Sequence, residues 1–160
     1  MTIIPAPQPC LHSDINMPQS PPLPKSWPQL QNSARAARQL AWAPYSQFSV
    51  GAALLTNTGE IVSGCNVENA SYGLTICAER TAVCRAIAMG HRQFDAICIS
   101  LPGPPVPCGA CRQFLIEFNS NLLVLLDNTD LPSGTPPESI LLHNLLPRAF
   151  HLLPTPPTGH

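Results

Sequence analysis

Two short motifs in this sequence combine cysteine thiols with a carboxylate. One residue separates Cys77 from Glu79, and Cys108 and Cys111 follow in a Cys-x-x-Cys arrangement. A zinc ion that only braces a fold usually takes four protein ligands, whereas a catalytic zinc takes three and leaves one position for water. The motifs therefore predict a zinc site that is open to solvent, with Glu79 as its catalytic acid-base group and with three ligands, Cys77, Cys108 and Cys111.

Both motifs stand where a helix is expected to begin. Helix N-termini carry partial positive charge and free amides, which stabilise thiolates and lower their pKa. Arg80 and Arg112 each lie next to a ligand, so we expect them to hydrogen-bond the sulfurs and to offset their negative charge.

The alternatives to a catalytic zinc are a bracing zinc and cysteine pairs that bind no metal. Glu79 on its own would be read as a solvated acid in the first turn of a helix, where the dipole favours it. His91 and His143 are the candidates for a fourth ligand, but both are remote from the motifs in sequence. The coincidence of Cys-x-Glu with Cys-x-x-Cys favours the catalytic interpretation.

The composition is that of a globular protein with a small neutral substrate. The chain has 160 residues, of which 44% are apolar and 11% charged, enough for one domain with a proper core. Its net charge is -1 and Lys25 is its only lysine, so it lacks the basic stripe of a nucleic-acid binder. No apolar run is long enough to span a membrane, and no signal segment begins the chain. We therefore expect a cytoplasmic protein without membrane or nucleic-acid partners.

The cysteine content also favours metal binding. Seven cysteines in a chain without a signal segment are better explained by a metal site than by disulfides. Cys84, on the same predicted helix as Cys77, and Cys98, in a strand-like run, are predicted to pack as small hydrophobic residues.

The pattern along the chain predicts one domain between two tails. Residues 1–25 hold seven of the 20 prolines and are expected to form a disordered tail, followed by a domain over 26–152 and a tail over 153–160. The turn signal Asn57-Thr58-Gly59 predicts a hairpin. Helices alternating with strands imply an α/β fold with helices covering a mixed sheet. The expected helices are 27–42, 77–89 and 109–118, the expected strands are 48–56, 60–66, 94–101 and 121–126, and 140–146 is a short strand or helix.

The motifs also suggest a reaction. Zinc-bound hydroxide attacks electron-poor carbons, and a nearby carboxylate moves protons. Zinc-dependent nucleobase deaminases use this arrangement, with three cysteines as one ligand option and a glutamate that is not a ligand. In this scheme Glu79 takes a proton from the zinc-bound water, hydroxide attacks C4 of cytosine, and Glu79 protonates N3 and helps ammonia to leave.

The sequence resembles the cytidine deaminase family, specifically its small homotetrameric type. The resemblance implies a three-layer α/β/α sandwich around a mixed sheet of about five strands, one Zn²⁺ per subunit and a homotetramer with shared active sites. It also implies hydrolytic deamination of cytidine and 2′-deoxycytidine to uridine and 2′-deoxyuridine in pyrimidine salvage. The resemblance covers about residues 27–152 and rests on five segments in family order: 43–54, 64–72, 77–82, 107–113 and 145–150.

The resemblance implies further site residues. Asn66 and Glu68 would hydrogen-bond the ribose 3′-hydroxyl, although the sequence alone favours turn capping for both. Phe48, which would otherwise be read as a core aromatic residue, would line the base pocket. Ala78 would offer its backbone amide to the base carbonyl, and Tyr72 would lie near the pocket.

Two more roles follow from the same resemblance. Phe150, otherwise a packing residue near the C-terminus, would stack on the pyrimidine in a neighbouring subunit's site. Arg80 matches the family position that reduces the thiolate charge. Three segments depart from the family pattern: the proline-rich N-terminus, the loop residues 102–105 and the end 151–154.

Two other functions compete with this one. The first is deamination of cytosine-bearing antibiotics of the blasticidin S type, which Arg80 and the segment 145–150 argue against. The second is a zinc-braced interaction module without catalysis, which requires a fourth protein ligand.

Overall fold

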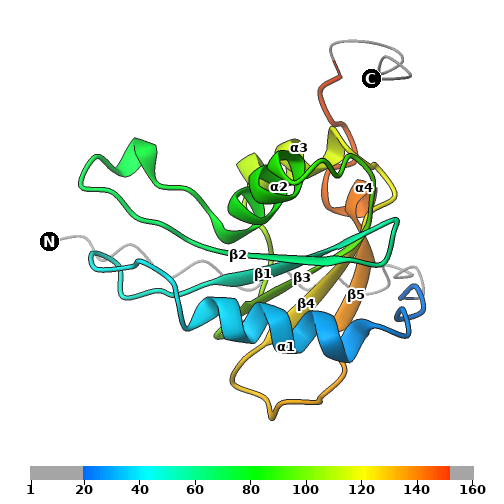
Figure 1. The fold of residues 1–160 in the computed structure, drawn as a ribbon, viewed down its shortest axis with the longest axis horizontal. Helices are drawn as coiled ribbons and strands as arrows, with labels where there is room; N and C mark the ends of the chain where they lie inside the picture. Colours follow the sequence, from blue (N-terminus) through cyan, green and yellow to red (C-terminus); the bar gives the residue numbers. More distant parts are fainter. Residues whose placement is uncertain (1–19, 152–160) are drawn as a thin grey trace, which may run out of the picture.

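A mixed five-stranded sheet forms the centre of the structure (Figure 1), a computed structural model that describes residues 20–151. Most of the predicted N-terminal tail, including Cys10, and the predicted C-terminal tail lie outside these residues. The strands are β1 (Gly51–Thr56), β2 (Ile61–Cys65), β3 (Phe94–Leu101), β4 (Leu123–Asn128) and β5 (Glu138–Leu141).

The sheet has the strand order β2-β1-β3-β4-β5. β3 and β4 run parallel, with Ile97 opposite Val124, while the other neighbouring pairs are antiparallel. The predicted turn joins β1 to β2 in a hairpin, where Gly59 adopts a positive φ of 86° that favours glycine. The hairpin and the parallel pair together make the sheet mixed, as the sequence predicts.

Helices cover both faces of the sheet. α1 (Trp27–Arg38) lies on one face, while α2 (Ala78–Ala88), α3 (Gly109–Ile116) and the short α4 (Leu142–Leu145) lie on the other (Figure 1). One apolar cluster fills the space under α2 and α3, and a smaller one lies between α1 and the sheet. The three-layer α/β/α sandwich is confirmed.

Several element boundaries differ from those predicted. α1 ends at Arg38 because the next residues leave the helix so that Trp42 can exchange backbone hydrogen bonds with Asn66 and Glu68. β1 begins only at Gly51, three residues later than predicted, and Gln47, just before the predicted strand, has a positive φ of 57°. The segment 140–146 contains both alternatives, the end of β5 and all of α4.

The two cysteines predicted to pack as hydrophobic residues behave differently. Cys98 is buried in β3, as predicted, but the prediction for Cys84 was wrong, because its side chain is exposed. The face of α2 that packs on the sheet carries Ala82, Val83 and Ala86. Position 84 falls outside this helical stripe and therefore faces away from the core.

A buried polar network fastens α1 to the end of β4. Asp127 is 2% exposed and accepts hydrogen bonds from Arg35 (2.8 Å), Gln31 (2.8 Å) and Ser100 (2.6 Å). Burial raises the pKa of Asp127, but the hydrogen bonds from these partners outweigh it and leave the pKa below its usual value. The carboxylate therefore stays charged at neutral pH and keeps its ion pair with Arg35.

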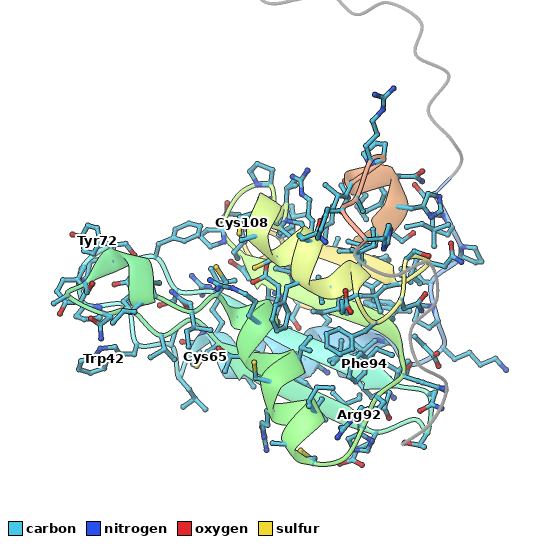
Figure 2. All side chains as sticks on the ribbon, turned by 90° about the horizontal axis from the view of Figure 1, so that it is seen from above. Trp42, Cys65, Tyr72, Arg92, Phe94 and Cys108 are labelled. Carbon is cyan, nitrogen blue, oxygen red and sulfur yellow. The ribbon has the colours of Figure 1, made fainter. Side chains whose placement is uncertain are left out.

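The arm between β2 and α2 projects from the domain. It includes a short 3₁₀ helix, η1 (Tyr72–Leu74), which the sequence analysis did not predict. Figure 2 shows Trp42 and Tyr72 on this projecting side, well apart from Phe94 in the core. Among the helices formed by residues 20–151, none has both the length and the apolar character that a membrane crossing requires.

Gly64 sets how closely α2 approaches the sheet. A Cβ atom at this position would lie 2.4 Å from the backbone nitrogen of Ala82 and 2.9 Å from the carbonyl oxygen of Ala78. We expect Gly64→Ala to lower the free energy of unfolding by about 1–3 kcal/mol, because backbone of α2 would have to move. Chemical denaturation measures this change. Gly73→Ala is the matched control, since no heavy atom of the described residues lies within 4 Å of its added Cβ, and an equal loss there would contradict the explanation.

Candidate metal centre and active site

Two helix N-termini bring three thiols together. Cys77 is the N-cap of α2 and Cys108 is the N-cap of α3, and Cys111 lies one turn later on α3. Their sulfurs all lie within 4.8 Å of one another. In the part of the chain that the structure describes, these three side chains are the one group of His, Cys, Asp or Glu residues arranged to hold a metal ion.

The thiol group fits zinc. Tetrahedral Zn²⁺ with bonds of about 2.3 Å to sulfur places the sulfurs about 3.8 Å apart, so only small side-chain movements are needed. Neither histidine considered as a fourth ligand belongs to the group. His91 instead forms an ion pair with Glu60, with 3.0 Å between Nε2 and Oε2. Within residues 20–151, three protein ligands would therefore hold the ion, one fewer than a bracing zinc usually takes.

The thiols of Cys77 and Cys111 have different pKa values. The pKa of the Cys77 thiol falls to about 5, chiefly because of the hydrogen bond with Cys111 and, against the effect of partial burial, because of Arg80. The pKa of Cys111 lies above its usual value, because of the same hydrogen bond and because the side chain is buried near Glu79. Zinc binding requires all three thiols to lose their protons, so metal uptake releases protons and is weakened by acid.

The two arginines beside the ligands differ in their contacts. Arg80 donates from Nη2 to the sulfur of Cys77 (3.5 Å) and to the carbonyl of Thr75 (3.2 Å), while its buried Nε has no partner among the described residues. The prediction for Arg112 was wrong. Its Nε donates to Pro107 O (2.8 Å) and its Nη1 to Leu145 O (2.9 Å), because α3 turns this side chain toward the C-terminal segment.

Glu79 lies in the first turn of α2 with its side chain turned inward. It is 4% exposed, which excludes the solvated acid considered from the sequence. Burial raises the pKa of Glu79 above its usual value, and although a backbone hydrogen bond opposes the shift, the negative charge of Cys77 adds to it. A buried carboxyl with a raised pKa is suited to accept and return a proton near neutral pH.

A pocket of about 440 Å³ opens beside these groups. This size is within the range of small-molecule sites. Its lining combines the metal centre with apolar and polar side chains from four parts of the chain: Ser46, Phe48, Val50, Asn66, Glu68, Thr75, Cys77, Ala78, Glu79, Leu101, Val106 and Cys108.

Asn66 supports the strand entry that carries Phe48. Its Oδ1 accepts from the amide of Val50 (2.8 Å) and its Nδ2 donates to the carbonyl of Phe48 (2.9 Å). These bonds add to the backbone hydrogen bond from Asn66 N to Val50 O (3.2 Å), and they leave one Nδ2 hydrogen available. Phe48 itself is exposed at the pocket and does not pack in the core.

Glu68 is held by the segment that precedes β1. Its carboxylate accepts from the amides of Tyr45 (2.9 Å) and Ser46 (3.2 Å) and from the Ser46 hydroxyl. The hydroxyl and then the amides lower the pKa of Glu68 below its usual value, so this carboxylate is charged at neutral pH. It is oriented before any ligand arrives.

Two of the predicted substrate-binding residues, Tyr72 and Phe150, do not line this pocket. Tyr72 is 75% exposed and packs edge-on against Tyr45 in an adjoining hollow of about 300 Å³, which shares Ser46, Glu68 and Thr75 with the main pocket. Phe150 is 68% exposed and lines neither cavity.

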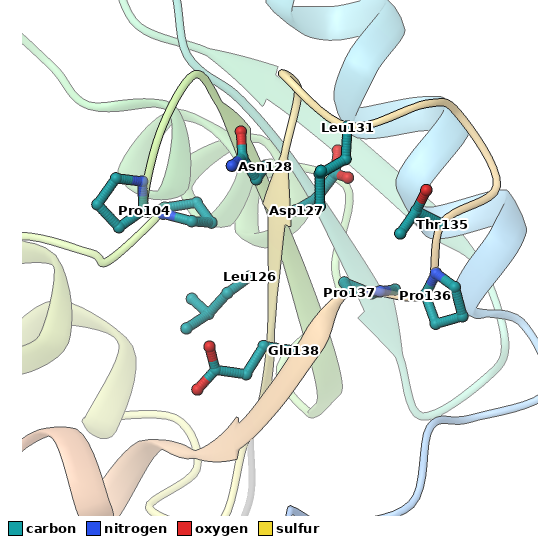
Figure 3. Close-up of a pocket in the computed structure, with 10 residues that line it drawn as sticks. Pro104, Leu126, Asp127, Asn128, Leu131, Thr135, Pro136, Pro137 and Glu138 are labelled. Carbon is teal, nitrogen blue, oxygen red and sulfur yellow. The ribbon is translucent and has the colours of Figure 1, made fainter.

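A larger hollow, of about 560 Å³, lies at the end of β4 (Figure 3). Pro104 comes from the loop after β3, and Pro136 and Pro137 come from the segment before β5 (Figure 3). The carboxylate of Asp127 at this hollow is already satisfied by Arg35, Gln31 and Ser100. Asp127 therefore offers no free carboxylate to the larger hollow, whereas the smaller pocket contains Glu79 beside the thiols of Cys77 and Cys108.

Sequence reasoning assigned no role to several lining residues. Ser46 lies within one of the segments that carry the family resemblance. Its position beside Glu68 depends on a tertiary contact that the sequence does not reveal. Val106 is placed by the proline-rich loop, and Leu101 by the end of β3. Their apolar character gives no local signal that separates a pocket wall from core.

Comparison with known proteins agrees with this geometry. Residues 27–126 match the family described as the cytidine and deoxycytidylate deaminase zinc-binding region. The chain belongs to this family. A cytidine deaminase of Sporosarcina psychrophila is 46% identical over 73% of the chain and 85% of the relative.

Solved structures agree with the family and the fold. A crystal structure of cytidine deaminase from Burkholderia pseudomallei has a TM-score of 0.71 and 50% identity, covering 76% of this chain and 97% of that one. The cytidine deaminase structure from Mycobacterium tuberculosis has a TM-score of 0.67 and 40% identity, covering 79% and 98%. The helices α2 and α3, which position the three thiols, therefore belong to a fold already known in cytidine deaminases.

The metal centre can be tested by removing its buried ligand. Because loss of even an outer partner of a zinc ligand costs about 10–100-fold in affinity, we expect Cys111→Ser to weaken zinc binding by more than about 100-fold. Metal analysis of the purified protein after dialysis measures this loss. Cys84→Ser is the control, since Cys84 is exposed on α2 outside the thiol group. Full zinc retention in Cys111→Ser would refute the assigned ligand set.

Proposed function

We propose that this chain is a zinc-dependent cytidine deaminase that hydrolyses cytidine and 2′-deoxycytidine to uridine and 2′-deoxyuridine with release of ammonia. One observation carries the proposal: a buried carboxyl, Glu79, shares a pocket with the Cys77 and Cys108 thiols at the start of two helices. Membership of the deaminase family, and the similarity to cytidine deaminases from other organisms, support the substrate class.

The residues divide the chemistry between them. The zinc ion, when held by the three thiolates, supplies a water molecule whose proton is more easily lost. Glu79, whose raised pKa suits proton transfer, would carry the two protons of this water one at a time: the first to N3 of the pyrimidine, and the second, from the hydroxyl group added at C4, to the departing amine. Arg80 donates to Cys77 and reduces the negative charge of the three sulfurs, which would otherwise oppose ionisation of the water.

The pocket lining suits a nucleoside. Phe48 and Val106 provide apolar walls for the flat base. The N-terminal amide of Ala78 faces no helical acceptor within α2, so we assign it to the base carbonyl. The charged carboxylate of Glu68 and the remaining Nδ2 hydrogen of Asn66 are suited to the ribose 3′-hydroxyl.

A structural zinc is the weaker alternative. A bracing zinc usually takes four protein ligands, and the thiol group in residues 20–151 offers three. Burying Glu79 beside that centre lowers the stability of the fold, and a bracing zinc would not require a buried acid there. The blasticidin-type deaminase differs from our proposal only in substrate, so parallel assays with cytidine and the antibiotic separate the two.

We further propose that the enzyme is a homotetramer with shared active sites, acting in pyrimidine salvage in the cytoplasm. Large apolar side chains gather along the projecting arm and the loop beside it, which is more typical of an interface than of free surface. Phe150 is held outside its own pocket and would stack on the pyrimidine in another subunit, while Tyr72 would border the site. The exposed apolar set is Trp42, Val67, Tyr72, Leu74 and Ile76.

The proton shuttle can be tested at Glu79. We expect Glu79→Gln to keep its zinc and to lower kcat for cytidine by about 10²–10⁴-fold or more, because an amide cannot accept the proton. The loss of cytidine absorbance, recorded with and without a chelator, measures the rate. Glu60→Gln, which changes an exposed glutamate away from the pocket, should remain active. An active Glu79→Gln enzyme would show that this carboxyl is not the shuttle.

The shared site can be tested at Phe150. Since stacking of an aromatic side chain on a base contributes about 1–3 kcal/mol, we expect Phe150→Ala to raise KM for cytidine about fivefold or more. Light scattering on the full chain should report a tetramer. A monomer with full activity would refute the shared-site arrangement.

A further inference from the structure

The side chain of Gln113 forms hydrogen bonds with both backbone groups of Phe150, its amide and its carbonyl. Its Nε2 donates to the Phe150 carbonyl (2.8 Å), and its Oε1 accepts from the Phe150 amide (3.2 Å). The primary amide thus replaces a neighbouring strand, since it offers one donor and one acceptor to a single residue. We call this pair of hydrogen bonds the Gln113 bracket.

The bracket starts from the helix that carries the metal ligands. Gln113 is two residues after Cys111 on α3. The intervening Arg112 donates to Pro107 O (2.8 Å), just before the Cys108 ligand, and to Leu145 O (2.9 Å), at the end of α4. Two consecutive residues of α3 therefore connect the C-terminal segment to the metal centre.

The bracket fixes the backbone of Phe150 while its ring stays in solvent. Phe150 as a residue is 68% exposed, so burial does not explain why it is held. A large apolar side chain left exposed forgoes the free energy that burial would give. Holding only the backbone is what presentation of the ring to a second surface requires, because it limits the directions in which the ring can point.

We propose that Gln113 is a positioning residue for substrate binding: it fixes the Phe150 backbone against α3 so that the ring meets the pyrimidine in the pocket of a second copy of this chain. The inference rests on the proposed deaminase function and on the role proposed there for Phe150. Gln113 touches neither substrate nor metal in this arrangement. Its effect should therefore pass through Phe150 alone.

The test uses two variants of Gln113 in the full-length zinc enzyme. Gln113→Met keeps the length of the side chain and removes both hydrogen bonds, while Gln113→Glu keeps its shape and removes the donor. We expect both to raise KM for cytidine about 5- to 50-fold, with kcat within about twofold, because stacking is lost while Glu79 and the ligands are untouched. Gln93→Met is the matched control, since Gln93 accepts an equally short bond from Asn57 (2.8 Å) elsewhere.

Two further measurements separate positioning from a structural role. Hydrogen exchange at the Phe150 amide should be faster in both variants and unchanged in Gln93→Met. Gln113→Met should change KM little when added to Phe150→Ala, because the two effects share one route. Faster exchange with an unchanged KM, a fall in kcat alone, or additive effects on KM would each overturn the proposal.

The same experiment distinguishes the failure of this inference from the failure of the proposed function. If the wild-type chain binds zinc and does not deaminate cytidine, the deaminase proposal falls and takes this role of Gln113 with it. If the wild-type chain is active and the variants keep a normal KM, only the positioning role is refuted. Metal analysis and thermal unfolding of each variant establish that the compared proteins are folded and loaded.

Discussion

The convergence of three thiols on one point is the constraint on which the rest of the structure depends. Cys77 and the Cys108–Cys111 pair come from separate helices. Their sulfurs meet because α2 follows β2 and α3 follows β3, two strands that finish at the same end of the sheet. Gly64 lets α2 approach β2 closely, and Leu101 ends β3 where the loop to Cys108 begins. The core therefore serves the site by fixing two helix N-termini relative to each other, and helix N-termini also favour thiolates.

The site carries an electrostatic conflict that a purely structural centre would avoid. Glu79 is buried beside sulfurs that must become negative, and burial of an acid near like charge costs stability. Arg80 offsets part of this cost through Cys77, and a bound Zn²⁺ would offset more. The same conflict raises the pKa of the carboxyl, which is the property that a proton carrier needs. Burial of Glu79 therefore lowers the stability of the fold and at the same time suits this carboxyl to proton transfer.

On the other face of the sheet, the buried carboxylate of Asp127 is fully hydrogen-bonded. Asp127 is as deeply buried as Glu79, yet Arg35, Gln31 and Ser100 satisfy its oxygens. Removing one member of such a pair costs about 3–5 kcal/mol, so the network secures α1 and the end of β4. Asp127 is therefore fully paired, whereas Glu79 lies in a pocket beside the thiols of Cys77 and Cys108. Outside both regions, Tyr72 on the arm and Phe150 are exposed in the single chain.

The sequence alone determined the features that depend on local pattern. Motif spacing identified Cys77, Cys108, Cys111 and Glu79, and periodicity with turn residues located the helices, the hairpin and the mixed sheet, because such signals act within a few residues. Tertiary structure alone decided where long side chains turned. It directed Arg112 toward Leu145 instead of the sulfurs, left Cys84 in solvent, used Asn66 to hold residues 48–50, and joined Gln113 to Phe150. Those partners lie far apart in sequence, and only the packing of whole elements brings them within hydrogen-bonding distance.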